Sequence, residues 1–180
     1  MALAVAARAA DQPRAWVADP RHSSAQFTIT HLGISHVRGV IPIVSAVISG
    51  DSPQLPARIT AKLDPSGVDT RNDQRDSDLK SPHFFDASRY GDILFQSSTI
   101  APIDAKDFTV TGNLTLHGVT RPVTLKTAFL GAMVGSRGEA RVAYEATTSI
   151  KRSDFGMTYA PLIAGDDVDI DIDIEAVAQK

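Results

Sequence analysis

The sequence predicts an all-β fold, a barrel or a sandwich of about eight strands, from three observations. Apolar and polar residues alternate with a period of two in segment after segment, these segments recur at regular spacing, and only one stretch has the features of a helix. The clearest segment is DDVDIDIDIEAV at residues 166–177, where the apolar residues between the acids are Val168, Ile170, Ile172 and Ile174. Only an extended chain can bury these residues on one face. A strand with one wet and one dry face has to close against others around an apolar interior.

Three more strands are predicted in the first half of the chain. The first has an apolar face made of Ala25, Phe27, Ile29 and His31. The second is the apolar run VRGVIPIVSAVIS at residues 37–49, which is interrupted by Gly39 and Pro42, residues that mark bulges, kinks or edges in strands. In the third, the apolar residues Ile59, Ala61 and Leu63 alternate with polar ones.

Four strands are predicted in the second half, before the acidic strand. Their apolar faces begin at Ile93, Phe108, Val123 and Val142, and each alternates with polar residues. The turn HGVTRP joins the second of these strands to the third. The glycine-rich segment GAMVGSRGE at residues 131–139 is predicted to be the connection to the fourth.

The one helical candidate lies between the two groups of strands, around residues 70–86. We expect Asp69 and Thr70 to cap the helix RNDQRDSDLKS, because short polar side chains accept hydrogen bonds from the free N–H groups of a first turn. Phe84 and Phe85 follow this polar segment directly. Two apolar rings beside a polar helix predict a plug or lid on an open barrel end.

Composition and charge exclude several classes of function. The chain has 180 residues, 43% of them hydrophobic and 22% charged, which suits a single globular domain over residues 11–180. A net charge of -3 and a content of seven Phe, three Tyr and one Trp provide neither a basic surface nor a stacking platform, which argues against nucleic-acid binding. No stretch approaches the roughly 18 apolar residues that a transmembrane helix needs.

The first ten residues, MALAVAARAA, form a small apolar run that ends like the cleavage site of a secretory signal. We expect residues 1–10 to be the remnant of such a signal. The alternative is a frayed tail at a misassigned start. The chain has no cysteine, which excludes a disulfide, a thiolate nucleophile and a cysteine metal site.

The sequence contains no motif for catalysis or metal binding. Alternate acids on one strand face lie about 6.6 Å apart, but the glycine turn and the final Glu of a calcium loop are missing. We therefore expect the acids of residues 166–177 to form a solvated outer face. The five histidines form no HxH or HxxxH pair, and GxSxG, P-loop and GxGxxG motifs are absent. The expectation is a protein that is not an enzyme.

Two groups of polar residues have both a structural and a ligand-binding interpretation. A polar ring on the apolar face of a strand is costly unless something bonds it, so His31 either bonds a neighbouring chain group or meets the polar end of a ligand. Arg71 and Arg75 would share a helix face, with Lys80 one to two turns further on. The interleaved acids favour a solvated, ion-paired helix, and the alternative is a cationic rim for an anionic head group.

Four segments in order along the chain carry a resemblance to a known family. They are DPRHSSAQFTITHLGISHVRG at residues 19–39, VDTRNDQRDSDLKSPHFFDASRYGDILFQS at 68–97, VTGNLTLHGVTRPVTL at 110–125 and KRSDFGMTYAPLIAGDDVDIDI at 151–172. Together they resemble the YceI family, bacterial periplasmic proteins with a lipocalin-like barrel. The four segments cover most of the chain from Trp16 onward, and the resemblance is specific because four separated segments with the correct spacing are hard to obtain by chance.

The resemblance implies an extended, eight-stranded antiparallel, lipocalin-like β-barrel with the helix inserted midway. It implies that a polyisoprenoid or similar long-chain lipid binds along an apolar tunnel, that the protein is periplasmic and a homodimer, and that it performs no chemistry on a substrate. The family usually has His where this chain has Asp78. An acid there would repel an anionic head group, which favours a neutral one such as a quinone or an amide.

Alternation and resemblance together predict the ligand-contacting residues. The predicted apolar wall consists of Phe27, Ile29, Phe84, Phe85, Phe95, Leu114, Val142 and Tyr144, and the predicted head-group residues are His31, Arg75 and Lys80. No cofactor is expected; the bound polyisoprenoid or quinone-like lipid is the ligand. Two other classes of function stay open. One is a metal- or His-dependent hydrolase that uses His22, His31 or His117, and the other is a ligand-free stress-response interaction protein whose barrel is filled by its own side chains.

Overall fold

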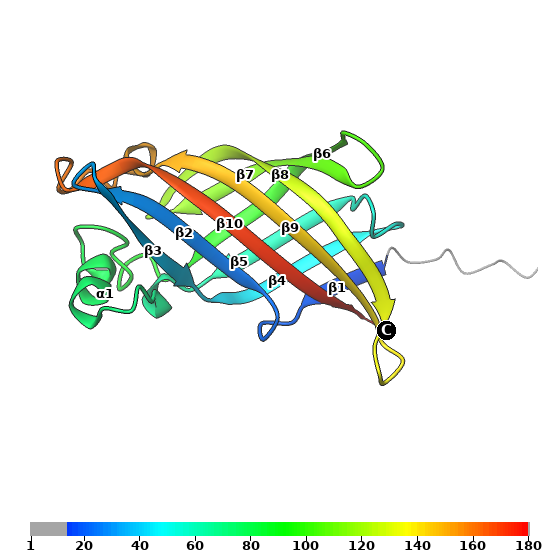
Figure 1. Cartoon of the computed structure of the whole chain (residues 1–180). Helices are drawn as coiled ribbons and strands as arrows, with labels where there is room; N and C mark the ends of the chain where they lie inside the picture. Colours follow the sequence, from blue (N-terminus) through cyan, green and yellow to red (C-terminus); the bar gives the residue numbers. More distant parts are fainter. Residues whose placement is uncertain (1–13, 180) are drawn as a thin grey trace, which may run out of the picture.

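The computed structural model describes residues 14–179, and most of its regular structure is strand (Figure 1). The predicted signal remnant at residues 1–10 lies outside the described residues. The strands are β1 (Arg14–Ala18), β2 (Ser24–His31), β3 (Ser35–Ile41), β4 (Ile43–Gly50), β5 (Arg58–Leu63), β6 (Ile93–Pro102), β7 (Asp107–Leu116), β8 (Val119–Val134), β9 (Ala140–Lys151) and β10 (Ala164–Ala178). The helices are η1 (Pro65–Gly67), α1 (Asp73–Lys80) and η2 (Arg152–Phe155).

The strands form one antiparallel sheet that closes into a barrel. Their order is β1-β4-β5-β6-β7-β8-β9-β10-β2-β3, and β1 also pairs with β10. β1 and β2 pair with successive parts of β10 on one side; on the other side β1 pairs with β4 and β2 with β3. Thus β1 and β2 together make one broken barrel strand, and β3 and β4 make its neighbour. The predicted eight-stranded antiparallel barrel is confirmed.

Proline and glycine shape the β2–β4 region. Pro42 separates β3 from β4, because proline has no N–H to donate to a sheet. Gly39 has a different role from the predicted bulge or kink: β2 and β3 stay in register across it. A Cβ at Gly39 would lie 2.5 Å from the Phe27 ring, so the absence of a side chain lets this ring pack directly over the β3 backbone.

Two strand boundaries differ from the sequence prediction. The five residues of β1, RAWVA, are too few to show a clear alternation, and the prediction misses this strand. β8 extends to Val134, well into the GAMVGSRGE segment that was predicted to be a connection. A register shift between Phe129 and Gly131 absorbs the glycine within the strand, and the turn itself is short, with Gly138 N–H donating to the Gly135 carbonyl at 3.0 Å.

α1 begins later than predicted. Arg71 has a φ of 61°, a left-handed conformation that cannot belong to an α-helix. Asn72 is therefore the N-cap, and its side-chain oxygen accepts a hydrogen bond from the Arg75 N–H at 2.9 Å. The predicted caps Asp69 and Thr70 are wrong for this reason, and Arg71 shares no helix face with Arg75.

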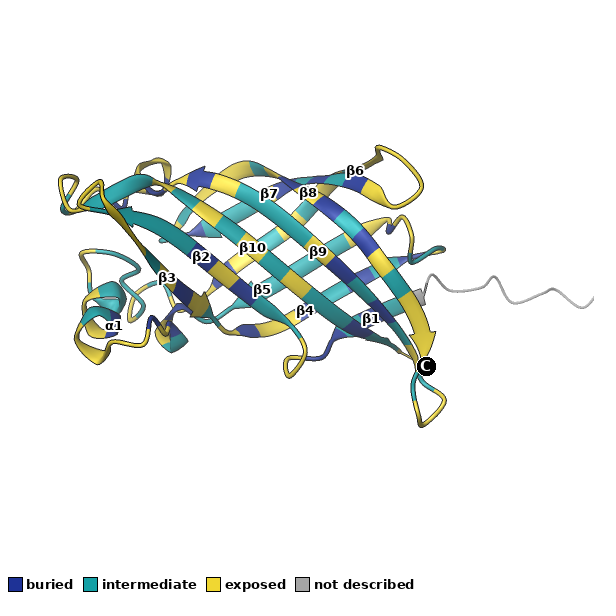
Figure 2. Ribbon diagram, in the orientation of Figure 1, coloured by how far each residue is buried: buried dark blue, intermediate teal, exposed yellow. Residues whose placement is uncertain are grey.

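The two ends of the barrel differ. At the end where β1 and the C-terminus lie, called the β1 end, the interior is filled by a cluster of buried side chains, namely Trp16, Ile48, Phe108, Val110, Leu125, Phe129, Val142, Tyr144 and Ala176. At the opposite end, called the α1 end, the segment of residues 64–92 with α1 lies beside the barrel opening (Figure 1). Figure 2 shows exposed and less exposed residues alternating along β10, so this strand has the predicted wet and dry faces.

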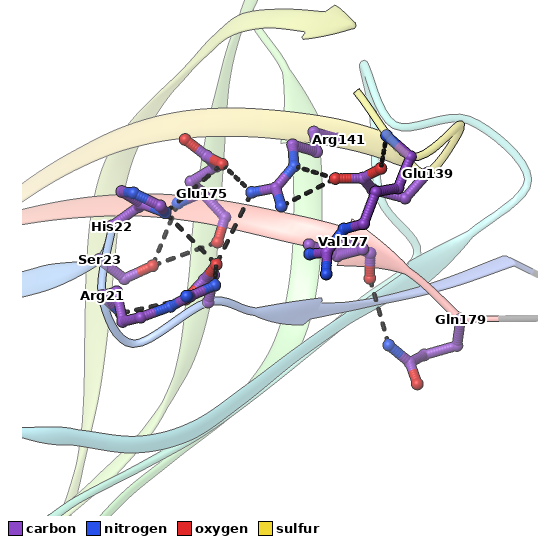
Figure 3. Close-up of polar contacts among 10 residues, drawn as sticks. Arg21, His22, Ser23, Glu139, Arg141, Glu175, Val177 and Gln179 are labelled. Carbon is purple, nitrogen blue, oxygen red and sulfur yellow. Dashed lines mark hydrogen bonds and ion pairs between the residues drawn. The ribbon is translucent and has the colours of Figure 1, made fainter. Parts of the chain in front are cut away.

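A network of charged side chains ties β9, β10 and the β1–β2 turn together at the β1 end (Figure 3). Arg141 of β9 donates to Glu139 at 3.0 Å and also to Glu175 of β10, and it lies 3.6 Å from Asp19. The Arg21 guanidinium donates to the Asp19 carboxylate at 2.8 Å. These hydrogen bonds from Arg21 hold the pKa of Asp19 well below its ordinary value. The network therefore fixes the short β1 strand against the long strands of the barrel.

Candidate functional site

A cavity of about 700 Å³ lies inside the barrel. Every strand from β2 to β10 contributes to its wall, together with residues of the 64–92 segment. Most of the wall consists of Ile, Leu, Val, Phe and Ala side chains. This volume is within the range of about 300–1,000 Å³ that ligand cavities have, and a wall of this kind favours an apolar ligand.

The cavity brings nine of the predicted contact residues together. They are Phe27, Ile29, His31, Arg75, Phe84, Phe85, Phe95, Leu114 and Tyr144. These residues come from β2, β6, β7, β9, α1 and the segment after α1, so the fold gathers side chains that are far apart in the sequence.

Two predicted contact residues, Lys80 and Val142, lie off the cavity wall. Val142 is on the predicted inner face of β9, but it packs into the buried cluster at the β1 end, beyond the cavity. The wall residues of α1 are Gln74 and Arg75 and, one turn further on, Asp78 and Leu79, so they share one helix face, and Lys80 is not on the wall.

The dry face of β10 forms one part of the cavity wall. Its members are Val168, Ile170, Ile172 and Ile174. The acids between them, Asp167, Asp169, Asp171 and Asp173, are exposed on the outer face of the barrel. Within residues 14–179 no three histidine or acidic side chains gather as a metal site would require. The alternation of this strand therefore separates a solvated outer face from an apolar inner face.

The polar wall residues near the α1 end differ in how they contact the rest of the chain. The His31 ring has no hydrogen bond to any residue in the range 14–179, so the bond to a neighbouring chain group does not form there. Arg75 donates to the Thr70 hydroxyl at 2.7 Å and to the Thr70 carbonyl at 2.9 Å. In the described part of the chain no carboxylate pairs with Arg71, Arg75 or Lys80, so α1 is not the ion-paired helix that its interleaved acids suggested.

Arg152 is a wall residue that the sequence prediction missed. Its side chain is only 5% exposed, and its guanidinium donates to the carbonyls of Met157 at 2.6 Å, Gly165 at 2.7 Å and Ala164 at 2.9 Å. These three bonds hold the loop between η2 and β10 in place. The signal available in the sequence was the KRSDFG motif, but a motif alone does not show which carbonyls an arginine reaches.

An aromatic cluster connects the segment after α1 to the loop between η2 and β10. The rings of His83 and Tyr159 are stacked, with centroids 4.0 Å apart and an interplanar angle of 6°, and Phe84 meets Tyr159 edge-on at 5.7 Å. His83 also lies 3.4 Å from Asp78. Because Phe84 and Asp78 line the cavity, this cluster lies at its α1 end.

The inner part of the cavity offers little polarity. The Tyr144 hydroxyl donates to the Pro53 carbonyl at 2.6 Å, and burial raises the pKa of this phenol above its ordinary value. The Thr127 hydroxyl is buried and has no hydrogen-bond partner among the described residues. A charged group placed in this part of the cavity would therefore find no counter-charge.

Comparison with known proteins identifies the family. The YceI-like domain matches residues 16–176. The chain belongs to the YceI family. Among the relatives of this YceI-family chain, a UPF0312 protein of Vibrio parahaemolyticus is 32% identical over 181 residues, covering 98% of the chain and 92% of that protein. A UPF0312 protein of Pseudomonas fluorescens is 36% identical over 166 residues, covering 89% of the chain and 84% of that protein.

Solved structures show the same fold. The YceI protein of Campylobacter jejuni superposes with a TM-score of 0.76 at 30% identity, covering 84% of this YceI-family chain and 90% of that one. A polyisoprenoid binding domain from Saccharophagus degradans has a TM-score of 0.68 at 16% identity, covering 91% of the chain and 98% of that domain. No helix within residues 14–179 is long and apolar enough to cross a membrane.

Proposed function

We propose that this YceI-family protein binds a polyisoprenoid or a similar long-chain amphiphilic lipid inside its barrel. The observation that supports the proposal most strongly is the cavity of about 700 Å³ with an apolar wall. The fold that the chain shares with the polyisoprenoid binding domain from Saccharophagus degradans supports the same ligand class.

The tail of the ligand supplies most of the binding free energy in this proposal. Burial of a methylene group stabilises a complex by about 0.8 kcal/mol. The costs of association and of ordering the chain remove part of that sum. Affinity should therefore follow tail length more than head-group identity.

The head group lies at the α1 end in this proposal, near His31, Arg75 and Asp78. Asp78 and Arg75 both line the cavity there, so their opposite charges largely offset each other, which favours a neutral head group such as a quinone or an amide over an anionic one. Lys80 lies on another face of α1 and is not part of the proposed head-group site.

A binding function is favoured over a hydrolase because the three candidate histidines lie in separate places, and two of them make contacts within the chain. His22 lies 3.3 Å from Asp19 in the turn after β1, and His117 contacts the Phe155 carbonyl at 3.0 Å in the turn after β7. His31 is on the cavity wall. A ligand-free interaction protein is disfavoured because its own side chains would have to fill the space that the cavity occupies.

We further propose that the protein acts in the periplasm as a homodimeric carrier. The resemblance of residues 1–10 to a secretory signal supports export. Fractionation of the native host and light scattering of the purified protein test these two points, and a cytoplasmic or monomeric protein would contradict them.

The ligand can be identified by purifying the protein from its native host and analysing a solvent extract by mass spectrometry. We expect about one long-chain lipid per barrel. Ala146→Trp, which places a large ring on the cavity wall, should reduce the amount of extracted lipid strongly. Ala143→Trp is the matched control, because this alanine is also on β9 but is not a wall residue. A wild-type protein without lipid that also takes up none in vitro would contradict the proposed function.

A further inference from the structure

Two neighbouring loops at the α1 end carry apolar side chains that the fold leaves uncovered. We name them the mouth loops: residues 32–34 between β2 and β3, and residues 156–163 between η2 and β10. Ile34 is 87% exposed and Leu162 is 91% exposed, while Leu32, Tyr159 and Ile163 are about half exposed. The Leu32 N–H donates to the Ile163 carbonyl at 2.8 Å, so the two loops lie side by side (Figure 1).

The apolar surface of the mouth loops continues into the cavity. Ile163 is part of the second loop and also lines the cavity, and His31, which directly precedes the first loop, lines it as well. Tyr159 of the second loop stacks on His83, which belongs to the segment beside the barrel opening. A surface that touches the mouth loops therefore touches the rim of the ligand cavity.

The mouth loops contain no charged residue. The segment from Phe155 to Gly165 has no Asp, Glu, Lys or Arg, and neither does the segment 32–35. The acids that follow, Asp166 and Asp167, lie 3.9 and 2.8 Å from the Lys151 ammonium on the outer surface of the barrel, so this lysine partly offsets their charge. Moving these loops into an apolar environment therefore avoids the free-energy cost of removing water from a charged side chain.

We propose that the mouth loops insert into the surface of a lipid bilayer and connect the cavity with the membrane that supplies or receives its ligand. The proposal rests on the proposed function, because a long-chain lipid leaves a bilayer for water only at great cost. The charge pattern favours this partner: exposed aliphatic tips without charges suit the boundary between head groups and acyl chains. A half-exposed tyrosine beside them suits the same boundary, where tyrosine is enriched.

Vesicle flotation tests the proposal. Wild-type protein is mixed with phosphatidylcholine vesicles and compared with the double variant Ile34→Gln/Leu162→Gln. We expect wild type to float with the vesicles and the variant to bind at least tenfold more weakly, because two aliphatic side chains lose their burial. The matched control is Met133→Gln/Val134→Gln, at the β1 end, where these residues are 64% and 69% exposed. This control should float like wild type.

Binding of dispersed parinaric acid, a fluorescent long-chain fatty acid, separates this proposal from the proposed function. Neither Ile34 nor Leu162 is on the cavity wall, so the mouth-loop variant should bind the dispersed probe like wild type but take it up from vesicles about tenfold more slowly. Failure of wild type to bind the dispersed probe would overturn the proposed function. Two outcomes would overturn the membrane proposal alone. In the first, wild type binds the dispersed probe but does not bind vesicles. In the second, wild type binds the probe, and wild type and variant bind vesicles equally well. A wild-type dimer that the variant converts to monomers, together with no vesicle binding, would assign the loops to a second copy of the chain instead.

Discussion

Thr127 illustrates what a single residue contributes to this barrel. It lies on β8 between Leu125 and Phe129, two members of the buried cluster at the β1 end. Alternation along β8 predicts that position 127 faces inward, and it does. Alternation does not predict that the hydroxyl lacks a hydrogen-bond partner among residues 14–179, because that depends on neighbours from β7 and β9.

Thr127→Val should stabilise the ligand-free protein. Valine has nearly the same shape, and it removes a buried hydroxyl without a partner, so the free energy of unfolding should rise by about 1 kcal/mol in chemical denaturation. Thr148→Val is the control, because the Thr148 hydroxyl donates to the Thr124 carbonyl at 3.0 Å and its loss should not stabilise. Equal effects of the two substitutions would contradict this account of Thr127.

Asp19 should contribute to the dependence of stability on pH. The hydrogen bonds from Arg21 lower its pKa in the folded state. A carboxyl with a lowered folded pKa stabilises the fold above its unfolded pKa of about 3.9, and this contribution is lost as the pH falls through the folded value. The loss of unfolding free energy caused by Asp19→Asn should therefore be larger at pH 6 than at pH 2.5. A loss that is the same at both pH values would contradict this role.

Among the elements, β10 and α1 show where the sequence is informative and where it is not. The strict alternation of residues 166–177 fixes which face of β10 is apolar, because a shift of one residue would turn every aspartate inward. The start of α1 depends on the left-handed conformation of Arg71, for which a sequence of polar residues gives no signal. A helix start that is displaced in this way changes which side chains face the cavity.

The aromatic cluster between the α1 segment and the η2–β10 loop should slow ligand exchange. Removing the Tyr159 ring breaks its stack on His83 and its edge contact with Phe84, and such pairs contribute about 0.5–1.5 kcal/mol each. We expect Tyr159→Ala, which removes both contacts, to raise the rate constant of ligand release about five- to a hundredfold in stopped-flow fluorescence. Tyr159→Phe keeps the ring and should release the ligand like wild type. Unchanged release by Tyr159→Ala would show that the cluster does not restrict the opening.

For the whole molecule, the sequence predicts the barrel better than the extent of its cavity. Alternation places Phe27, Leu114, Tyr144 and Val142 on inward faces, and all four side chains do point into the interior. Whether an inward residue lines the cavity or packs into solid core depends on how far the β1-end cluster extends, which is a property of all strands together. Val142 faces inward but packs into the β1-end cluster and does not line the cavity.

The central claim is that the barrel cavity accommodates a lipid tail, and the affinity for straight-chain alcohols of increasing length tests it most directly. The account predicts that Kd falls with each added methylene, by up to about fourfold per group, until the cavity of about 700 Å³ is filled, and that it then stays constant. A Kd that does not depend on chain length, or no binding at any length, would contradict the claim.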